Sequence, residues 1–299
     1  MHDISCIGHI TLDKVITAKG IVHMAGGTSF YFSNAIRSMD IRYQLITTLA
    51  KEEMYIVSGL REEGIEVHVP SFSAHTVYFE NDYSEGMDNR SQRVLQQSAP
   101  FTAEQLTNIS ARIFHLGPLL ADDIPLETIE ALSRKGRVSL DVQGYLRRVE
   151  NKKVFLNDWV EKKEALPFVH MLKANEPEMY ALTGCTDVRR AAFMLFDWGV
   201  KEIIITLGSR GSVIYNGVDF YEIPAYSPVT SVVDATGCGD TYMAGYLYQR
   251  IKGKSYQHSG EFAAAMATLK IESSGPFTGT EKNVHDLLMN SKRKVFLDW

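Results

Sequence analysis

Cysteine is scarce in this chain of 299 residues, which contains only Cys6, Cys185 and Cys238. The three are scattered, without the close spacing of a metal site or the even framework of a disulfide-rich secreted domain. This scarcity indicates a reducing compartment, and we expect a cytoplasmic protein.

An excess of basic residues and a long apolar run are also missing. Lysine and arginine number 31 against 36 acidic residues, for a net charge of −5, which gives no electrostatic support for binding nucleic acid or an anionic membrane. No apolar stretch reaches the roughly 18 residues that a membrane helix requires, and no basic or long apolar leader precedes the first strand-like run, residues 4–8. The sequence therefore predicts small-molecule partners, with no nucleic acid and no membrane.

Short β-rich runs alternate with longer amphipathic segments along the chain. Residues 112–116, 138–142 and 202–206 are runs of this kind, and their alternation with helical patterns predicts βαβ units and a mostly parallel sheet flanked by helices. A hydrophobic content of 45% suits one large α/β domain over residues 1–299. We expect a doubly wound α/β fold.

Several predicted strands end in a glycine or a small polar residue. These strand ends are Gly8, Gly117, Asp141, Asn175 and Gly208. Because ligands of open α/β sheets bind at the carboxyl ends of the strands, we expect the five to converge on one crevice.

Two stretches depart from the alternating pattern. Residues 14–25 have the pattern of a compact hairpin, and residues 76–97 contain two further β-like runs. Both pieces are short, and together they predict a small β lid.

Residues 234–245, Asp-Ala-Thr-Gly-Cys-Gly-Asp-Thr-Tyr-Met-Ala-Gly, are the most informative segment. Gly237 and Gly239 allow successive N–H groups to face one concavity at the positive end of the following helix, and such a nest binds a phosphoryl group. Asp240 beside the nest is then a natural general base for an attacking hydroxyl group. The alternative is an Asp cap on a glycine-rich turn.

This segment resembles the C-terminal signature of the ribokinase-like (PfkB) carbohydrate kinases, and other segments agree with that family in order and spacing. They are residues 8–13 (Gly-His-Ile-Thr-Leu-Asp), Gly26-Gly27, residues 173–178 (Lys-Ala-Asn-Glu-Pro-Glu) and residues 206–211 (Thr-Leu-Gly-Ser-Arg-Gly). The resemblance spans nearly the whole chain. It implies a ribokinase-like fold and a kinase that transfers the γ-phosphoryl group of ATP to a hydroxyl group.

The resemblance also assigns roles around the phosphate. Asp240 is the implied base, and the N–H groups from Gly237 through Cys238 and Gly239 to Asp240 stabilise the transferred group. Asn175 and Glu178 are implied to organise Mg²⁺, partly through water. The alternative for this pair is a helix start with Asn as the cap.

Nucleotide and cation sites follow from the same resemblance. Thr206, Gly208 and Gly211 are implied to hold the nucleotide phosphates, unless they form an ordinary hairpin loop. The small-residue helix at 263–267 and the loop containing Ser274 and Gly275 resemble the adenine and monovalent-cation region, with close helix packing as the alternative. Asp234 and Thr236 could then hold K⁺ together with carbonyl groups of that loop.

On the acceptor side, the resemblance points to Asp13 and Asn34 for hydroxyl recognition, with Gly26 and Gly27 allowing close backbone approach. Aromatic residues follow Gly27 where ribose kinases commonly carry glycine and alanine, so ribose need not be the substrate. Residues 26–34, the short lid and residues 141–147 (Asp-Val-Gln-Gly-Tyr-Leu-Arg) are similar to the myo-inositol kinase branch. Gln143 and either Arg147 or Arg148 could contact the cyclitol or the triphosphate, unless these arginines lie on a solvated face.

Other interpretations stay open. Fructose, ribose or a nucleoside could be the acceptor, and a non-catalytic sugar or nucleotide sensor could use the same fold. A phosphofructokinase would need a basic cluster near the acceptor, and the sequence around Asp13 and Asn34 lacks a clear one. The resemblance allows a monomer or a lid-mediated homodimer. Asn89, Arg90 and Arg93 of the lid could contact substrate or form a charged rim. Cys238 at a helix N-terminus could have a lowered thiol pKa, or it could simply be a small residue that fits there.

Overall fold

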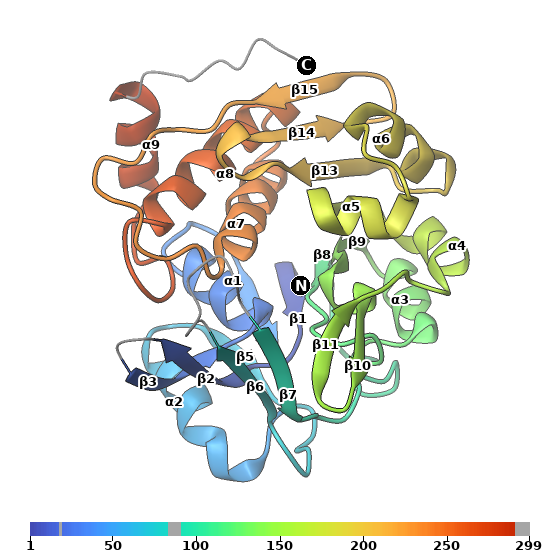
Figure 1. Cartoon of the computed structure of the whole chain (residues 1–299), viewed down its shortest axis with the longest axis vertical. Coiled ribbons are helices and arrows are strands. Elements are labelled where there is room, and N and C mark those ends of the chain that lie inside the picture. The colour runs from blue at the N-terminus through green and yellow to red at the C-terminus, as the bar shows by residue number, and fades with distance from the viewer. Residues whose placement is uncertain (18–19, 83–90, 291–299) are drawn as a thin grey trace.

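The computed structural model describes residues 1–17, 20–82 and 91–290 (Figure 1). Seven parallel strands form most of the larger sheet, and two antiparallel strands extend one edge. In spatial order the strands are β15 (Phe220–Ile223), β14 (Ser212–Tyr215), β13 (Glu202–Thr206), β12 (Met171–Asn175), β9 (Arg137–Asp141), β8 (Ala111–Leu116), β1 (His2–Ile7), β4 (Tyr43–Ile46) and β5 (Glu66–His68).

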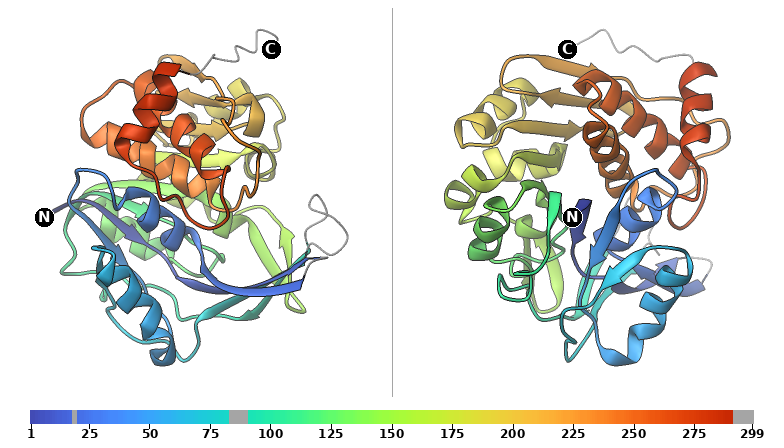
Figure 2. Two further views of the ribbon diagram at one scale, coloured as in Figure 1. Left: turned by 90° about the vertical axis from the view of Figure 1, so that its left-hand side faces the viewer. Right: turned by 180° about the vertical axis from the view of Figure 1, so that it is seen from behind.

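Helices cover both faces of this sheet, as the views in Figure 2 show. One face packs against α1 (Thr28–Ile36), α2 (Met54–Glu62), α7 (Cys238–Ile251), α8 (Tyr256–Lys270) and α9 (Glu281–Asn290). The other packs against α3 (Leu126–Ser133), α4 (Lys162–Ala165), α5 (Glu176–Thr183) and α6 (Val188–Asp197). Because both faces are buried, central strands are continuously apolar, as in Ile203-Ile204-Ile205 of β13. The prediction of a mostly parallel α/β sheet is confirmed. Strands β8, β9 and β13 lie at the runs predicted at residues 112–116, 138–142 and 202–206.

A second sheet of six strands lies beside the first (Figure 2). Its order is β10 (Arg147–Glu150), β11 (Lys153–Leu156), β7 (Ser91–Gln96), β6 (Val77–Asp82), β2 (Thr11–Thr17) and β3 (Gly20–Gly26). Four of these strands occupy the two stretches predicted for the lid. The hairpin β10–β11 also joins this sheet, the lid sheet, through pairing of Lys153 with Arg93, so the two predicted stretches make up only part of it.

Short 3₁₀ turns complete the described structure at Lys51–Glu53, Val142–Leu146, Leu166–Phe168 and Gly208–Arg210. Within the described ranges, we find no helix with the length and apolar character needed to span a bilayer. Asn89 and Arg90 lie outside the described residues.

Candidate active site

A cavity of about 550 Å³ lies where the six-stranded sheet meets the carboxyl ends of the parallel strands. Both sheets contribute to its lining. Thirteen residues singled out from the sequence line it: Asp13, Gly27, Asp141, Gln143, Arg147, Asn175, Thr206, Asp234, Thr236, Gly237, Gly239, Asp240 and Ser274. Segments far apart in the sequence therefore meet around one space, as parallel-strand geometry predicts.

The anion nest forms at the N-terminus of α7. Gly237 caps the helix with φ 76°, and a Cβ atom there would collide with the ring of Tyr31, so only glycine fits. The N–H of Cys238 donates to the Ala235 carbonyl oxygen at 3.1 Å. This corrects the predicted nest, because the Cys238 amide is already bonded in a turn. The N–H groups of Gly239 and Asp240 lie in the first turn of α7, where an α-helix offers them no partner, and they belong to the positive end of the helix dipole.

Asp240 stands in the first turn of α7 and lines the cavity. Burial is the main influence and raises the pKa of its carboxyl group to about 7, and the charge of Asp141 acts in the same direction. The charge of Lys173 and a hydrogen bond with the Thr28 side chain oppose the rise. A carboxylate with a pKa near 7 is well matched to proton abstraction at neutral pH.

Lys173 is a residue of this site that the sequence interpretation missed. Its buried Nζ lies 2.9 Å from Asp141 Oδ2 and 3.6 Å from Glu178 Oε2. Burial disfavours the charge, yet these two carboxylates hold the pKa of Lys173 above its ordinary value. The ammonium also lies against Gly239, where an added Cβ would be 3.0 Å from Nζ. The nest is therefore flanked by a fixed positive charge.

The signal for Lys173 was present in the sequence. A single charged residue interrupts the apolar strand β12 two positions before Asn175, and side chains two apart on a strand share one face. Residue pairing completes the cluster, because Lys173 is the register partner of Asp141 across β12 and β9.

Asn175 and Glu178 form the helix cap that was the alternative interpretation. The Asn175 side chain accepts from the Glu178 N–H at 2.9 Å, and Glu178 Oε2 accepts from the Asn175 N–H at 2.8 Å. Burial raises the pKa of Glu178, while Lys173 opposes the rise. Asn175 lines the cavity and Glu178 lies behind it.

The 206–211 segment is a hairpin loop between β13 and β14, with Thr206 opposite Ser212. Thr206 faces the cavity, whereas Gly208 and Gly211 are not among its lining residues. Gly211 has φ 94° and packs against the Ile223 carbonyl, where a side chain would collide. The Arg210 guanidinium forms an ion pair with Glu176. The helix at 263–267 is buried against α7 and shows the close packing considered as its alternative role.

At the opposite end of the cavity, Asp13 on β2 accepts a hydrogen bond from Thr11 Oγ1 at 2.7 Å. Gly26 on β3 leaves room for this carboxylate, which a Cβ at position 26 would meet. Asn81 and Gln92 of the same sheet line the cavity and are joined by a 2.8 Å hydrogen bond. Neither was predicted, because strand pairing alone brings them beside Asp13.

Asn34 does not line the cavity. Its amide donates to the Phe30 carbonyl oxygen at 2.9 Å within α1 and its side-chain oxygen accepts from Arg37, while the residue is almost fully buried. Tyr31, on the cavity side of α1, lines the site instead. The lining residues Gly27, Thr28 and Tyr31 lie at the start of α1, whereas Asn34 lies about one turn farther along the helix.

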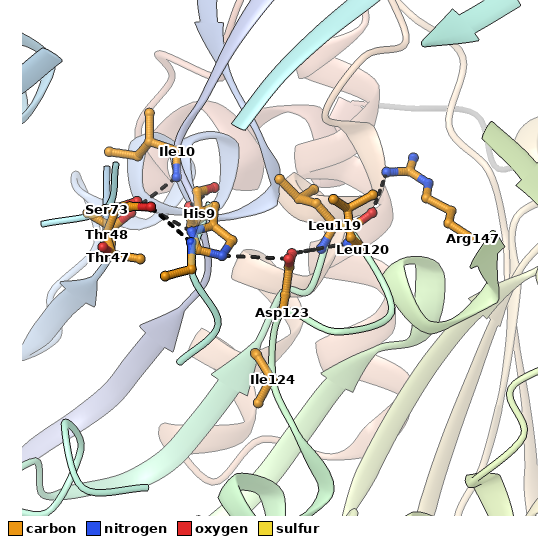
Figure 3. A network of polar contacts seen from close by, with 12 residues as sticks. His9, Ile10, Thr47, Thr48, Ser73, Leu119, Leu120, Asp123, Ile124 and Arg147 are labelled. Carbon is orange, nitrogen blue, oxygen red and sulfur yellow. Dashed lines mark hydrogen bonds and ion pairs between the residues drawn. The ribbon is translucent and has the colours of Figure 1, made fainter. Parts of the chain in front are cut away.

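A buried polar network holds the loop that carries the cavity residue Leu119 (Figure 3). Asp123 Oδ2 accepts from the N–H groups of Leu119 and Leu120 at 2.7 and 3.0 Å, and Asp123 Oδ1 lies 3.6 Å from His9 Nε2. Arg147 Nη1 donates to the Leu119 carbonyl oxygen at 3.0 Å, as Figure 3 shows. The network therefore positions Arg147 at the cavity.

Cys238 does not have the lowered thiol pKa that its place at a helix N-terminus could give. Burial raises its pKa to about 12, and its Sγ lies 3.7 Å from the Ala267 carbonyl oxygen. The helix N-terminus does not overcome desolvation here. Gly275 is also outside the cavity lining, although Ser274 belongs to it.

A base with a pKa near 7, amides at a helix N-terminus and a buried ammonium converge on one cleft between a sheet and its lid. This combination defines a phosphotransferase that acts on a hydroxyl group. The model of the pfkB family carbohydrate kinases matches residues 2–283. The chain belongs to the pfkB carbohydrate kinase family.

Individual proteins agree with this membership. The chain is 28% identical to a cytidine kinase of Thermococcus kodakarensis, over 85% of this chain and 90% of that protein. A solved pyrophosphate-dependent kinase of the ribokinase family, complexed with a pyrophosphate analog and myo-inositol, superimposes with a TM-score of 0.85 at 29% identity, covering 95% and 99% of the two chains. Arabidopsis thaliana ribokinase, complexed with ribose and ATP, has the same fold, with a TM-score of 0.78 at 22% identity over 96% and 98%. The predicted ribokinase-like fold and kinase class are confirmed.

Proposed function

We propose that the protein transfers a phosphoryl group from ATP to a hydroxyl group of a cyclitol, with myo-inositol as the acceptor. The observation that carries this proposal is Asp240, a base with a pKa near 7 beside the amides of the α7 N-terminus and the Lys173 ammonium. The acceptor lies between Asp240 and the lid, so that one hydroxyl group reaches the carboxylate.

In the proposed reaction, Asp240 accepts the proton of the attacking hydroxyl group. The amides of Gly239 and Asp240 hold the transferred phosphoryl oxygens, and Lys173 balances the charge that develops on them. These groups are fixed before the ligands bind, because Gly237 and the Lys173–Asp141 pair are locked by packing and hydrogen bonds.

Mg²⁺ is implied by the family, and the donor set suits it. Among the described residues, no three Asp, Glu, His or Cys side chains gather closely enough to hold a metal ion alone. Mg²⁺ commonly takes one or two carboxylates and completes its shell with water and substrate phosphates. Asn175 at the cavity and Glu178 behind it would hold it partly through water, with Asp141 nearby, and it would neutralise charge on the donor phosphates.

Two features favour a polyol as the acceptor. Side chains that donate and accept hydrogen bonds surround the lid end of the cavity on rigid strands and a short helix, namely Asp13, Asn81, Gln92, Gln143 and Arg147. The structural relative complexed with myo-inositol supports the same choice. A nucleoside is the second acceptor candidate, supported by the identity with a cytidine kinase.

Pyrophosphate is the second donor candidate. Solved kinases described as pyrophosphate-dependent align at 28 to 29% identity over nearly the whole chain. The nest and Lys173 would hold the reacting phosphoryl group of either donor, so the donor is chosen by groups farther from Asp240.

The test measures whether each acceptor is phosphorylated with each of the two donors. Phosphorylated product is measured for myo-inositol, other cyclitols, ribose, fructose, cytidine, adenosine and fructose 6-phosphate, with Mg²⁺ and either ATP or pyrophosphate. We expect selective turnover of myo-inositol, and a loss of about 10²- to 10⁴-fold in Asp240→Asn, the usual contribution of a general base. Asp219→Asn, at an exposed aspartate on the β14–β15 loop, is the matched control. Selective turnover of another acceptor would replace the cyclitol assignment, and ligand binding without any turnover would favour the sensor.

A further inference from the structure

Lys270 is the last residue of α8, and its side chain is completely buried. Its Nζ donates a hydrogen bond to the Asp234 carbonyl oxygen at 2.8 Å and lies 3.5 Å from Asp234 Oδ2. A buried ammonium is stable only when such partners replace water. The contact joins the end of α8 to the segment that leads into the nest.

This arrangement can be compared with the potassium site that the family resemblance implied at Asp234 and Thr236. Asp234 Oδ1 accepts from the Thr236 N–H at 2.9 Å, while the carbonyl oxygen and Oδ2 face Lys270. The Ile271 carbonyl oxygen accepts from the N–H groups of Val233 and Asp234 at 2.7 and 3.3 Å. A potassium ion on the Asp234 oxygens would lie beside the ammonium, where two positive charges repel strongly. The residues present do not fit a bound potassium ion.

We propose that Lys270 is a built-in monovalent cation, which replaces K⁺ at Asp234 and makes this kinase independent of potassium. The inference rests on the proposed kinase function only for its activity measurements. A tethered cation has no binding equilibrium, so the loop from Asp234 to Gly237 keeps its conformation in any salt.

Two contacts carry the effect of Lys270 to the nest. The ammonium lies 6.0 Å from the centroid of the Tyr31 ring, and the same ring packs directly against Gly237, the helix cap. One turn earlier in α8, the Ala267 carbonyl contacts Cys238 in the nest segment. Burial is the main cause of the raised pKa of Cys238, and the positive charge of Lys270 opposes that rise. The electric field of Lys270 therefore reaches the nest.

The first experiment compares initial rates of the wild-type protein in potassium, sodium and tetramethylammonium chloride at equal ionic strength. We expect the rates to differ by less than about 2-fold, well under the coupling of about 5-fold or more typical of an allosteric ligand. Activation by potassium of about 5-fold or more would overturn the proposal.

The second experiment uses Lys270→Ala, which opens space beside an unpaired Asp234. We expect a loss of about 10-fold or more in tetramethylammonium, because the partly buried carboxylate of Asp234 then lacks the ammonium that faces it, with recovery in potassium or methylammonium. Lys252→Ala is the matched control, since Lys252 pairs on the surface with the exposed Asp40. A Lys270→Ala protein that keeps full activity in every salt would also overturn the proposal.

Binding measurements keep the inference testable without turnover. Thallium(I) is a potassium analogue, and ²⁰⁵Tl NMR should detect no bound ion in the wild-type protein, whose melting temperature should be equal in potassium and sodium. A bound thallium signal would overturn the inference even if Lys270→Ala does not fold. If no acceptor is phosphorylated, the proposed function fails, while the thallium and melting results still decide the role of Lys270.

Discussion

Asp240 is subject to opposing influences from its neighbours. Burial and the carboxylate of Asp141 favour its protonated form, whereas Lys173 and Thr28 favour the ionised form. The balance gives a pKa of about 7. This single residue accounts for two measurable properties, the pH dependence of activity and a cost in stability.

The pH profile of kcat/KM is expected to rise with pH through about 7 and then level off, because only ionised Asp240 accepts a proton. The rate is measured from pH 5 to 9 on the preferred acceptor. Melting temperatures over the same range serve as the control against unfolding. A rate that is already level between pH 5 and 9 would instead indicate a carboxylate with its ordinary pKa, near 4.

Asp240→Asn is expected to stabilise the protein while it lowers turnover by about 10²- to 10⁴-fold. The folded-state pKa of about 7 exceeds the ordinary 3.8, so the native state binds the proton more tightly and ionisation costs stability as the pH rises from about 4 to 7. We expect a gain of about 1–3 kcal/mol in the free energy of unfolding above pH 7, allowing for solvent in the cavity, and no gain near pH 4. Urea unfolding at both pH values checks this, and a variant less stable than wild type at pH 8 contradicts it.

At the scale of elements, residues of the site lie together at the carboxyl ends of the parallel strands. Lys173 and Asp141 are register partners on neighbouring strands, as are Asn175 and Thr206. A sequence pattern identifies a strand end, but which strand lies beside it depends on contacts across the whole chain.

The sequence predicted the parts of the site that depend on local geometry and missed those that depend on long-range contacts. Asp240 and Gly237 lie in one continuous segment whose local geometry follows from glycine and helix-start chemistry. Lys173, Tyr31 and Lys270 act through partners 32 or more residues away, in other elements. The hairpin β10–β11 was missed likewise, because its addition to the lid depends on long-range pairing with β7.

Substitution of Asp123 tests whether the loop that carries Leu119 positions Arg147. Asp123→Ala removes the acceptor of two buried N–H groups, so we expect a loss of about 2–4 kcal/mol in stability and a KM for the acceptor raised about 10-fold, with kcat changed far less. Asp123→Asn keeps an acceptor oxygen and is the matched control. A kcat that falls as much as KM rises would show that the network acts on the chemical step.

At the scale of the whole molecule, the cavity lies between two sheets, and a ligand that contacts both couples them. Asp13, Asn81 and Gln92 are on the lid sheet, while Asp240 and the nest are beside the larger sheet. The acceptor is therefore expected to bridge the two, whereas the donor contacts mainly the larger sheet.

Hydrogen exchange can separate these two kinds of binding. The acceptor at about 100 times its Kd stabilises the native state by roughly 2.7 kcal/mol, and we expect slower exchange in β2, β3 and β6 because the ligand holds the lid. The donor alone should protect the segment from Asp234 to Asp240 and leave the lid strands unchanged. In the Asp13→Asn variant, the acceptor should no longer slow exchange in the lid strands, because Asp13 lies at the lid end of the cavity. The donor should still protect the segment from Asp234 to Asp240. If the donor alone protected the lid strands as strongly as the acceptor does, the donor would also contact both sheets. That result would contradict the assignment of the acceptor to the lid end of the cavity.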